Sequence, residues 1–347
     1  MKIRKFLVLL LYLLIVSVVF LSACAQSAET ELPPQEPAAE EPTSEEPTAE
    51  EPAAEELTKI RMAVLPVLEL TPIYVAMQEG IMAKNGIEVE MIPVASGQEK
   101  DQLLAIAEAD CGQAEHLSVI LSNQEEITQQ NITGSFLSSE SHPIFSIIAG
   151  ANSGIESMED LKGVEIGTSE ATVNEYVATR ILQNNGFSDE DIKYLAVPRI
   201  PDRMALLENG ELKAASLPTH LGLMVVQTQG AKIIADDGQY PGLMEATWSC
   251  RKEFIDENPE AIKGFVAAIG EAVEIINEDP QKFKGLAIEN GMIPGPIVET
   301  YVMPTFPAPF VPSEEAFMDT YQWAIERGLV SNENIAFEDT VRPEFIP

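Results

Sequence analysis

The sequence predicts an α/β protein built on mostly parallel sheets. From Lys59 onward, short apolar segments that fit strands alternate with helical segments of about ten residues. Strands joined by helices of this length pair in parallel through right-handed crossovers. Residues 150–237 contain one full series of such units, which is enough for one compact lobe, and 347 residues allow two ordinary domains.

The first 23 residues have the pattern of a secretory signal. Lys2, Arg4 and Lys5 precede the apolar run from Phe6 to Leu21. This run is shorter than the ~20 residues that a membrane span needs, although an N-terminal membrane anchor is the alternative interpretation. The sequence "LSAC" at 21–24 resembles a bacterial lipobox. The resemblance implies that residues 1–23 form a lipoprotein signal peptide and that Cys24 is lipidated.

Residues 24–57 are predicted to form a disordered tether. The unit Glu-Glu-Pro recurs every five residues, ending at Pro42, Pro47 and Pro52, and no aromatic residue occurs from Ala25 to Thr58. Such a composition cannot bury enough apolar surface to fold. We expect the tether to hold a folded domain away from the membrane.

Charge and cysteine content exclude several classes of function. The net charge is −35, and removing the three cations and eleven glutamates that precede Leu57 leaves −27. A surface this acidic repels nucleic acid.

Cys111 and Cys250 are expected to be buried free thiols, since a domain of this size is stable without a disulfide; a bridge between them is the alternative. No spacing of Cys and His fits a metal site, and no cofactor is expected.

The elements follow in order along the chain. Strands are predicted at 60–66, 87–94, 110–115 and 143–150, with helices at 71–85, 98–109 and 117–123, the first of them capped by Thr71 ahead of Pro72. A second series has strands at 164–169, 192–197, 214–219 and 231–237, with helices at 173–184, 202–209 and 220–229. A returning strand at 246–254 leads to a long helix after Asn258-Pro259, and a last helix covers 314–326.

The long helix after Pro259 carries an apolar stripe that we assign to the core. The stripe consists of Ile262, Phe265, Val266, Ile269, Val273 and Ile276.

Five segments in this order resemble solute-binding proteins of the nitrate/sulfonate/taurine and thiamine-precursor type. They are "IRMAVLPVLELTPIYVA", "GIEVEMIPVASG", "SGIESMEDLKGVEIGTSEATVNEYVA", "RKEFIDENPEAIKGF" and "PTFPAPFVPSEE". The resemblance covers about residues 59–329. It implies a type II periplasmic binding protein fold, with two lobes joined by a hinge. Lobe 1 would be 58–149 and 241–347, and lobe 2 would be 150–240.

The same resemblance implies an extracytoplasmic, membrane-anchored protein that acts as a monomer. It would capture a small molecule between the lobes and deliver it to an ABC permease and its ATPase. A sensor lipoprotein is the alternative. Pyrimidine synthases share this fold family but carry a cysteine-rich motif that is missing here, and the export signal also argues against them. We therefore expect no catalytic activity.

Ligands of open α/β sheets bind at the carboxyl ends of strands. Four loops at such ends are candidates: 68–74, 113–116, 168–175 and 218–220. The candidate binding residues are Leu68, Glu69, Thr71, Tyr74, Glu115, His116, Ser169, Thr172, Arg199, Thr219, His220 and Trp248. Thr172 with Glu175 also fits a capping box, and Trp248 also fits the core. Arg203 is assigned to the helix that follows Arg199.

The charges near the expected cleft favour one class of ligand. Glu69, Glu115, Glu175 and Glu245 lie there with few cations, whereas sulfonate and nitrate binders need positive or donor-rich pockets. This favours a neutral or cationic heterocycle, such as a pyrimidine precursor of a vitamin. A sulfonate, taurine or nitrate ligand is the alternative.

Overall fold

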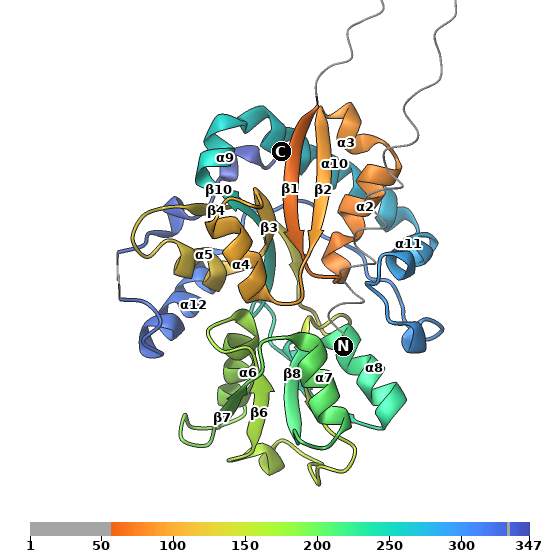
Figure 1. The fold of residues 1–347 in the computed structure, drawn as a ribbon, viewed down its shortest axis with the longest axis vertical. Coiled ribbons are helices and arrows are strands. Elements are labelled where there is room, and N and C mark those ends of the chain that lie inside the picture. The colour runs from red at the N-terminus through yellow and green to blue at the C-terminus, as the bar shows by residue number, and fades with distance from the viewer. Residues whose placement is uncertain (1–56, 332–333) are drawn as a thin grey trace, which may run out of the picture. The chain divides into compact units, whose positions relative to one another are not determined.

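The computed structural model describes residues 57–331 and 334–347, and these residues form two five-stranded sheets. The predicted signal peptide, Cys24 and the tether up to residue 56 lie outside the described residues. In Figure 1 the first sheet lies in the upper half of the folded part and the second in the lower half. The α/β architecture predicted from the sequence is confirmed.

The first sheet has the strand order β2-β1-β3-β10-β4. Its strands are β1 (Thr58–Val64), β2 (Ile87–Pro93), β3 (Cys111–Ala114), β4 (Gln129–Leu137) and β10 (Glu245–Arg251). Strand β1 pairs in parallel with β2 and β3, whereas β10 is antiparallel to both β3 and β4. Four strands therefore share one direction, and β10 runs the other way.

The second sheet repeats this plan in the order β7-β6-β8-β5-β9. Its strands are β5 (Phe145–Ala149), β6 (Glu165–Thr168), β7 (Lys193–Ala196), β8 (Ala214–Pro218) and β9 (Lys232–Asp236). Here β5 is the reversed strand, since it is antiparallel to both β8 and β9. The predicted boundary at 149–150 falls after β5, although β5 pairs in the second sheet.

The two reversed strands follow from the way the chain crosses between the lobes. The chain passes from β4 into β5, and it returns from β9 into β10. A strand that enters from the cleft starts at the edge where its neighbours end, so it must run antiparallel to them. The carboxyl ends of the remaining strands of both sheets thus face the same gap.

Helices cover both sheets. They are α2 (Thr71–Gln78), α3 (Ile81–Lys84), α4 (Gly97–Ala105), α5 (His116–Ser122), α6 (Val173–Asn184), α7 (Ile200–Glu208), α8 (Thr219–Gln229), α9 (Lys252–Glu257), α10 (Pro259–Glu278), α11 (Lys284–Glu289) and α12 (Glu314–Glu326). Short 3₁₀ turns lie at Leu68–Leu70, Glu159–Leu161, Asp237–Gln239, Pro280–Phe283, Gly295–Ile297, Phe337–Asp339 and Pro343–Phe345. No described helix is both long and apolar enough to cross a membrane.

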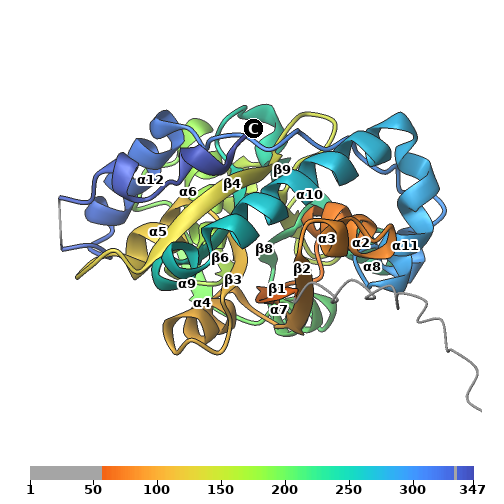
Figure 2. The ribbon, with the colours of Figure 1, turned by 90° about the horizontal axis from the view of Figure 1, so that it is seen from above.

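The long helix α10 forms much of the core of the first lobe. All six apolar stripe residues predicted from the sequence are buried. In Figure 2 the helix crosses the first lobe, with α2, α3 and α11 at one end of the view and α5 and α12 at the other. Helix α12 packs against α5, which extends the first lobe with a segment from the end of the chain.

Strand β4 has no counterpart in the sequence prediction, because its sequence "QQNITGSFL" is mostly polar. Its first eight residues are nevertheless buried. Their side chains find polar partners on the neighbouring strand: Thr247 Oγ1 donates to Asn131 Oδ1 at 2.7 Å, and Gln129 bonds to Ser249. Only the tertiary pairing with β10 makes this polar sequence compatible with burial.

Two further local predictions need correction. Thr71 is not the N-cap of α2 but its first residue, and its hydroxyl donates to the carbonyl of Leu68 at 2.7 Å. Cys111 and Cys250 are not free thiols: they form a disulfide with a Cα–Cα distance of 3.9 Å. The physical reason is the antiparallel register of β3 and β10, which sets these residues directly opposite each other.

Candidate functional site

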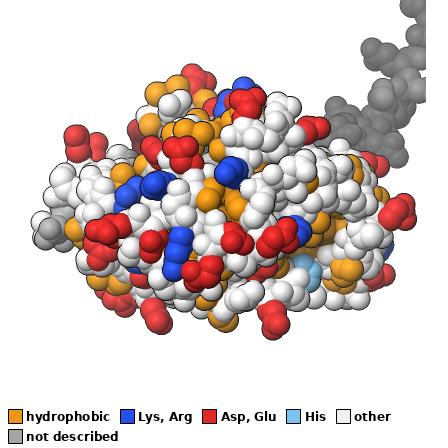
Figure 3. Space-filling view, turned by 90° about the horizontal axis from the view of Figure 1, so that it is seen from below, with side chains coloured by type: hydrophobic (Ala, Val, Ile, Leu, Met, Phe, Trp, Pro, Cys, Tyr) orange, Lys and Arg blue, Asp and Glu red, His pale blue; other side chains and the backbone are white. Residues whose placement is uncertain are grey.

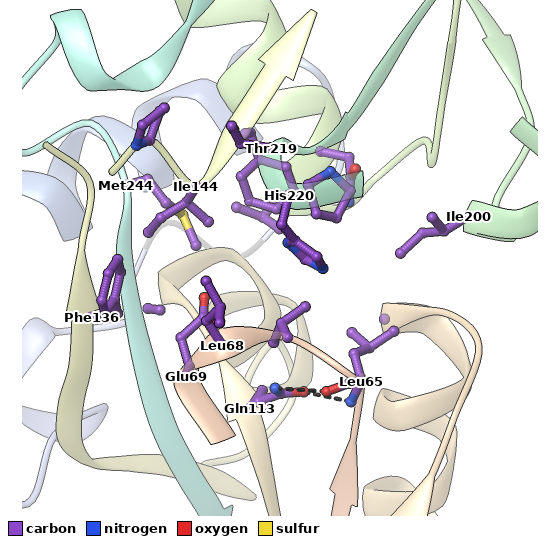
Figure 4. A pocket seen from close by; sticks show the side chains of 18 of the residues that line it. Leu65, Leu68, Glu69, Gln113, Phe136, Ile144, Ile200, Thr219, His220 and Met244 are labelled. Carbon is purple, nitrogen blue, oxygen red and sulfur yellow. Dashed lines mark hydrogen bonds between the residues drawn. The ribbon is translucent and has the colours of Figure 1, made fainter. Parts of the chain in front are cut away.

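A cavity of about 500 Å³ lies between the two sheets, and residues of both lobes line it. The first lobe contributes the loops after β1 and β3 and the start of α4, while the second contributes the first turns of α6, α7 and α8. Figure 4 shows His220 and Thr219 on one side of the cavity, facing Leu65, Leu68 and Glu69 on the other. The cavity therefore lies where the strand direction predicts a ligand site.

Seven of the twelve candidate binding residues line this cavity. They are Leu68, Glu69, Glu115, Ser169, Thr172, Thr219 and His220. They come from all four predicted loops, which the fold brings together at the carboxyl ends of β1, β3, β6 and β8.

The other five candidates lie outside the lining. Trp248 is 1% exposed and belongs to the core, as its alternative interpretation predicts. Thr71 is buried behind the Leu68 turn, and Tyr74 packs against the core from within α2. His116 is buried with its Nε2 3.3 Å from Glu245 Oε2, and its ring meets Phe317 edge-on at 5.8 Å between centroids.

The fifth, Arg199, has a side chain that is 60% exposed. It is the N-cap of α7 and has extended backbone, so its side chain does not follow the helix face. Arg203, one turn later, is fully buried and lines the cavity instead. The sequence contained the necessary signal, because Arg203 and Leu207 are four residues apart and both fall on the buried face of α7.

One residue of the loop before α6 has a strained backbone conformation, and a buried carboxylate stabilises it through a hydrogen bond. Ala171 has φ 54°, which is unusual for a residue with a Cβ. Glu175, only 1% exposed, accepts the N–H of Ala171 at 2.7 Å and pairs with Arg327. Thr172 is the N-cap of α6 as predicted and accepts from the N–H of Asn174 at 3.3 Å. Glu175 therefore fixes the loop that carries Ser169 and Thr172.

In the first lobe, Gln113 fixes the corresponding loop. Its Oε1 accepts from the Leu65 N–H at 2.6 Å, and its Nε2 donates to the Leu65 carbonyl at 3.1 Å. These two bonds tie the end of β3 to the chain leaving β1, as Figure 4 shows. The side chains of Leu65 and Leu68 are thereby held as an apolar wall of the cavity.

Polar side chains at the start of α4 and α5 form a small ionic cluster in the first lobe. Lys100 is 2% exposed, and its Nζ lies 2.7 Å from Asp101 Oδ1. Burial acts to lower the pKa of Lys100, but Asp101 and Glu115 hold this pKa above its usual value. Glu115 caps α5 by accepting the Ser118 N–H at 3.2 Å, and burial raises its pKa. Each of these charges has a partner within the cluster.

Two other lining residues have shifted pKa values. Burial raises the pKa of Glu69 to about 7 and lowers the pKa of His220 to about 4. His220 is therefore neutral at pH 7, and Glu69 is divided between its charged and neutral forms.

Burial also lowers the pKa of Arg203, to about 10, so this side chain stays charged at neutral pH. Glu175 and Glu245, which the sequence places near the cleft, are not part of the lining. They pair with Arg327 and with His116 and Ser313, respectively.

The described residues offer no group of three or more His, Cys, Asp or Glu side chains that could hold a metal ion. On the face drawn in Figure 3, red acidic side chains are spread among neutral ones, and blue basic side chains occur between them without forming a continuous patch. That face does not have the basic surface of a nucleic-acid-binding protein.

Comparison with curated proteins gives distant relatives. The chain is 30% identical over 129 residues to a protein of Haemophilus influenzae named "Putative thiamine biosynthesis protein", which covers 36% of this chain and 38% of the relative. It is 24% identical over 214 residues to a binding protein of Brucella abortus, covering 60% of this chain and 63% of that protein. The chain thus spans less than two thirds of either relative.

Solved structures show the same fold. The alkanesulfonate-binding protein SsuA of Xanthomonas axonopodis, bound to MOPS, superposes with a TM-score of 0.70 at 14% identity, covering 83% of this chain and 99% of SsuA. The nitrate-binding protein NrtA of Synechocystis gives 0.63 at 14% identity, with 84% and 87% covered. The desulfurization enzyme DszB gives 0.62 at 15% identity, with 83% and 97% covered. At these identities the likeness establishes the periplasmic-binding-protein fold alone.

The model of one protein family, described as NMT1/THI5 like, matches residues 68–283. This range contains the whole second lobe, both crossings and all the predicted site loops. With a match over more than half of its length, this chain belongs to the NMT1/THI5-like family.

Proposed function

We propose that this protein is an extracytoplasmic solute-binding protein that holds one small organic molecule between its lobes and delivers it to an ABC importer. The observation that carries the proposal is the cavity of about 500 Å³ lined by both lobes. Ligand pockets of this kind typically measure about 300–1,000 Å³. A molecule bound in contact with both walls favours the closed arrangement, because its contacts with the two walls exist together only there.

The size of the cavity bears on the class of ligand. A nitrate ion is not much larger than a water molecule, whose share of liquid volume is about 30 Å³, so nitrate would fill a small part of this space. The cavity suits an organic ring or chain better. A pyrimidine precursor of a vitamin or a related heterocycle is our first candidate. A sulfonate is the second, and the buried Arg203 in the lining favours it.

The proposal extends to where the protein works. A lipid on Cys24 would anchor the chain to the outer face of the cell membrane, and the Glu/Pro-rich segment would space the folded part from it. The partners would be a permease and its ATPase, with the binding protein acting as a monomer. We propose binding and delivery without a catalytic step. A sensor lipoprotein would use the same cavity but pass its signal to a different membrane partner.

Native mass spectrometry of the full-length protein in detergent tests the proposal. We expect the native mass to exceed the denatured mass by that of one small molecule. A thermal-shift panel of pyrimidines, sulfonates and nitrate would follow, since a ligand at 100 times its Kd adds about 2.7 kcal/mol of stability. The absence of both an added mass and any thermal shift would contradict the solute-binding function.

A further inference from the structure

We propose that the solute carries an acidic group, a carboxylate, sulfonate or phosphate, and that this group pairs with the guanidinium of Arg203. The inference rests on the proposed solute-binding function and narrows its ligand to organic anions. Among the candidates named above, it favours a sulfonate or a heterocycle that carries an acidic group over a neutral or cationic ligand, which was expected from the small number of cations in the cleft.

The central observation is a buried charge without a partner. Arg203 is 0% exposed and lines the cavity, yet its Nε, Nη1 and Nη2 atoms have no hydrogen-bond partner among the described residues. Burial is what lowers its pKa, with no described carboxylate compensating. An unpaired buried charge is costly, so natural proteins pair such groups. A guanidinium also matches the two-oxygen edge of a carboxylate, sulfonate or phosphate.

Apart from Glu69, an acid that cannot pair with an anionic group, the other charged side chains of the lining have partners. Lys100 pairs with Asp101, and Glu115 caps α5. The cation nearest in sequence, Arg199, is exposed to water and lies 3.9 Å from Asp202. Arg203 is thus distinguished from its neighbours both by full burial and by its lack of a protein partner.

The polar atoms of the lining differ between the two lobes, and this difference indicates where the acidic end and the apolar body of the solute would lie. Apart from Asp101, which pairs with Lys100, the buried lining atoms without a hydrogen-bond partner all belong to the second lobe. They are Ser169 Oγ, Asn174 Oδ1, His220 Nε2 and the three nitrogens of Arg203. The Arg203 nitrogens and the Ser169 hydroxyl can donate to an anion, whereas Asn174 Oδ1 accepts and would face an N–H or O–H group of the solute. The first lobe presents Leu65, Val67 and Leu68, and beside them Glu69, whose carboxylate would repel an acidic group. The acidic end of the solute therefore faces the second lobe, and its apolar body faces the first.

The experiment compares matched pairs of probes on the full-length protein by calorimetry and thermal shift. The pairs are phenylacetate with phenylacetamide, benzenesulfonate with benzenesulfonamide, and phenyl phosphate with phenol. We expect at least one anionic member to bind more tightly than its neutral partner, and the pair that responds identifies the acidic group. Arg203→Met should weaken that binding by at least about 30-fold, as truncating one side of a buried charge pair does.

Two further variants separate a binding role from a structural one. Arg203→Lys keeps the charge and should bind with intermediate strength, because a lysine cannot make the two-pronged contact. Arg199→Met removes an arginine four residues away that is exposed, and should bind as the wild type does. Without ligand, Arg203→Met should melt at or above the temperature of the wild type, since it removes an unpaired buried charge.

Three outcomes would overturn the inference. One is a set of pairs in which the neutral members bind as well as the anionic ones. A second is anion binding that survives in Arg203→Met. The third is a ligand-free Arg203→Met protein that melts well below the wild type, which would make Arg203 a structural residue. If no member of the panel binds any variant and native mass spectrometry shows no added mass, the solute-binding function itself fails, and the inference fails with it.

Discussion

At the scale of single residues, Asp237 connects the two crossings between the lobes. It lies directly after β9, and its Oδ1 accepts the N–H groups of Ile144 and Phe145 at 2.8 and 3.2 Å, where the first crossing enters β5. The side chain is fully buried, its Oδ2 has no hydrogen-bond partner among the described residues, and burial raises its pKa to about 7. One carboxyl thus holds both crossings at the edge of the second sheet.

The raised pKa of Asp237 predicts a dependence of stability on pH. Between pH 3.8 and about 7 the folded protein holds a proton that the unfolded chain releases, so this residue lowers the free energy of unfolding as pH rises. Asp237→Asn keeps an oxygen acceptor and removes the titration. We expect the variant to gain up to about 4 kcal/mol relative to wild type at pH 8, and little at pH 4.

Urea unfolding of both proteins at a series of pH values measures this effect. Asp237→Ala is the control, because it removes the acceptor for the Ile144 and Phe145 N–H groups and should be less stable at every pH. A constant difference between wild type and Asp237→Asn across this range would contradict the assignment.

At the scale of elements, the Cys111–Cys250 disulfide joins β3 to the reversed strand β10. It links residues 139 apart in sequence, across a segment that contains the whole second lobe. Closing a loop this long restricts the unfolded chain strongly. The disulfide therefore links β10, on which the chain returns from the second lobe, to β3 of the first sheet.

We predict that Cys111→Ala combined with Cys250→Ala lowers the free energy of unfolding by about 2–5 kcal/mol. The second lobe keeps its own sheet, so the native far-ultraviolet circular dichroism should change little. Guanidinium unfolding with and without dithiothreitol measures the effect. The reductant should destabilise the wild type and leave the double variant unchanged; equal sensitivity of the two proteins would contradict this role.

A second set of contacts between elements connects α6 of the second lobe to α12 and the residue that follows it. Arg180 Nη2 lies 2.8 Å from Asp319 Oδ1, and the Tyr176 hydroxyl donates to Asp319 Oδ2 at 2.6 Å. Arg327, which directly follows α12, pairs with the buried Glu175. Glu175 also accepts the N–H of Ala171, so its ion pair with Arg327 helps to hold the loop that lines the cavity.

We predict that Arg327→Met destabilises the protein by about 1–3 kcal/mol, because it leaves the carboxylate of Glu175 buried with fewer partners. It should also weaken solute binding, since the loop at Ser169 loses part of its support. Chemical unfolding and calorimetry with the solute found by mass spectrometry are the two readouts. Lys162→Met, which removes an exposed pair with Glu159, is the matched control and should affect neither.

At the scale of the whole molecule, the proposed function requires that the cavity open and close. The first turn of α4 lies close to the second lobe at one edge, where Gln98 Nε2 donates to the Glu170 carbonyl at 3.2 Å. Both side chains are exposed, and their neighbours Gly97 and Ala171 line the cavity. This contact is therefore a suitable place to restrain the two lobes.

We predict that Gln98→Cys with Glu170→Cys, joined by a short bifunctional thiol reagent, slows both uptake and release of solute. The lobes could then no longer separate at this edge, while the cavity itself would remain intact. Stopped-flow binding before and after cross-linking measures the rates. Each single-cysteine variant treated with the same reagent is the control. Unchanged rates in the cross-linked protein would mean that solute passes without separation of the lobes there.

The sequence was sufficient to predict those features that depend on residues close together in the chain. Helices α6 and α12 begin and end at the residues expected from their caps and apolar spacing, and the apolar stripe of α10 is buried as predicted. The alternation of strands and helices was enough to place four site loops at strand ends, and seven of twelve candidate residues reach the cavity. These features depend on contacts within a few residues, which periodicity and capping report directly.

The features that the sequence alone did not predict depend on contacts between segments far apart in the sequence. Strand β4 is a strand because β10 satisfies its polar side chains, and Cys111 meets Cys250 because the chain returns beside β3. Arg203 rather than Arg199 enters the cavity, because α7 begins between them and turns only the later side chain inward. Periodicity assigns a residue to a face of its element, but only the packing of both lobes determines which charges face water and which face the cavity.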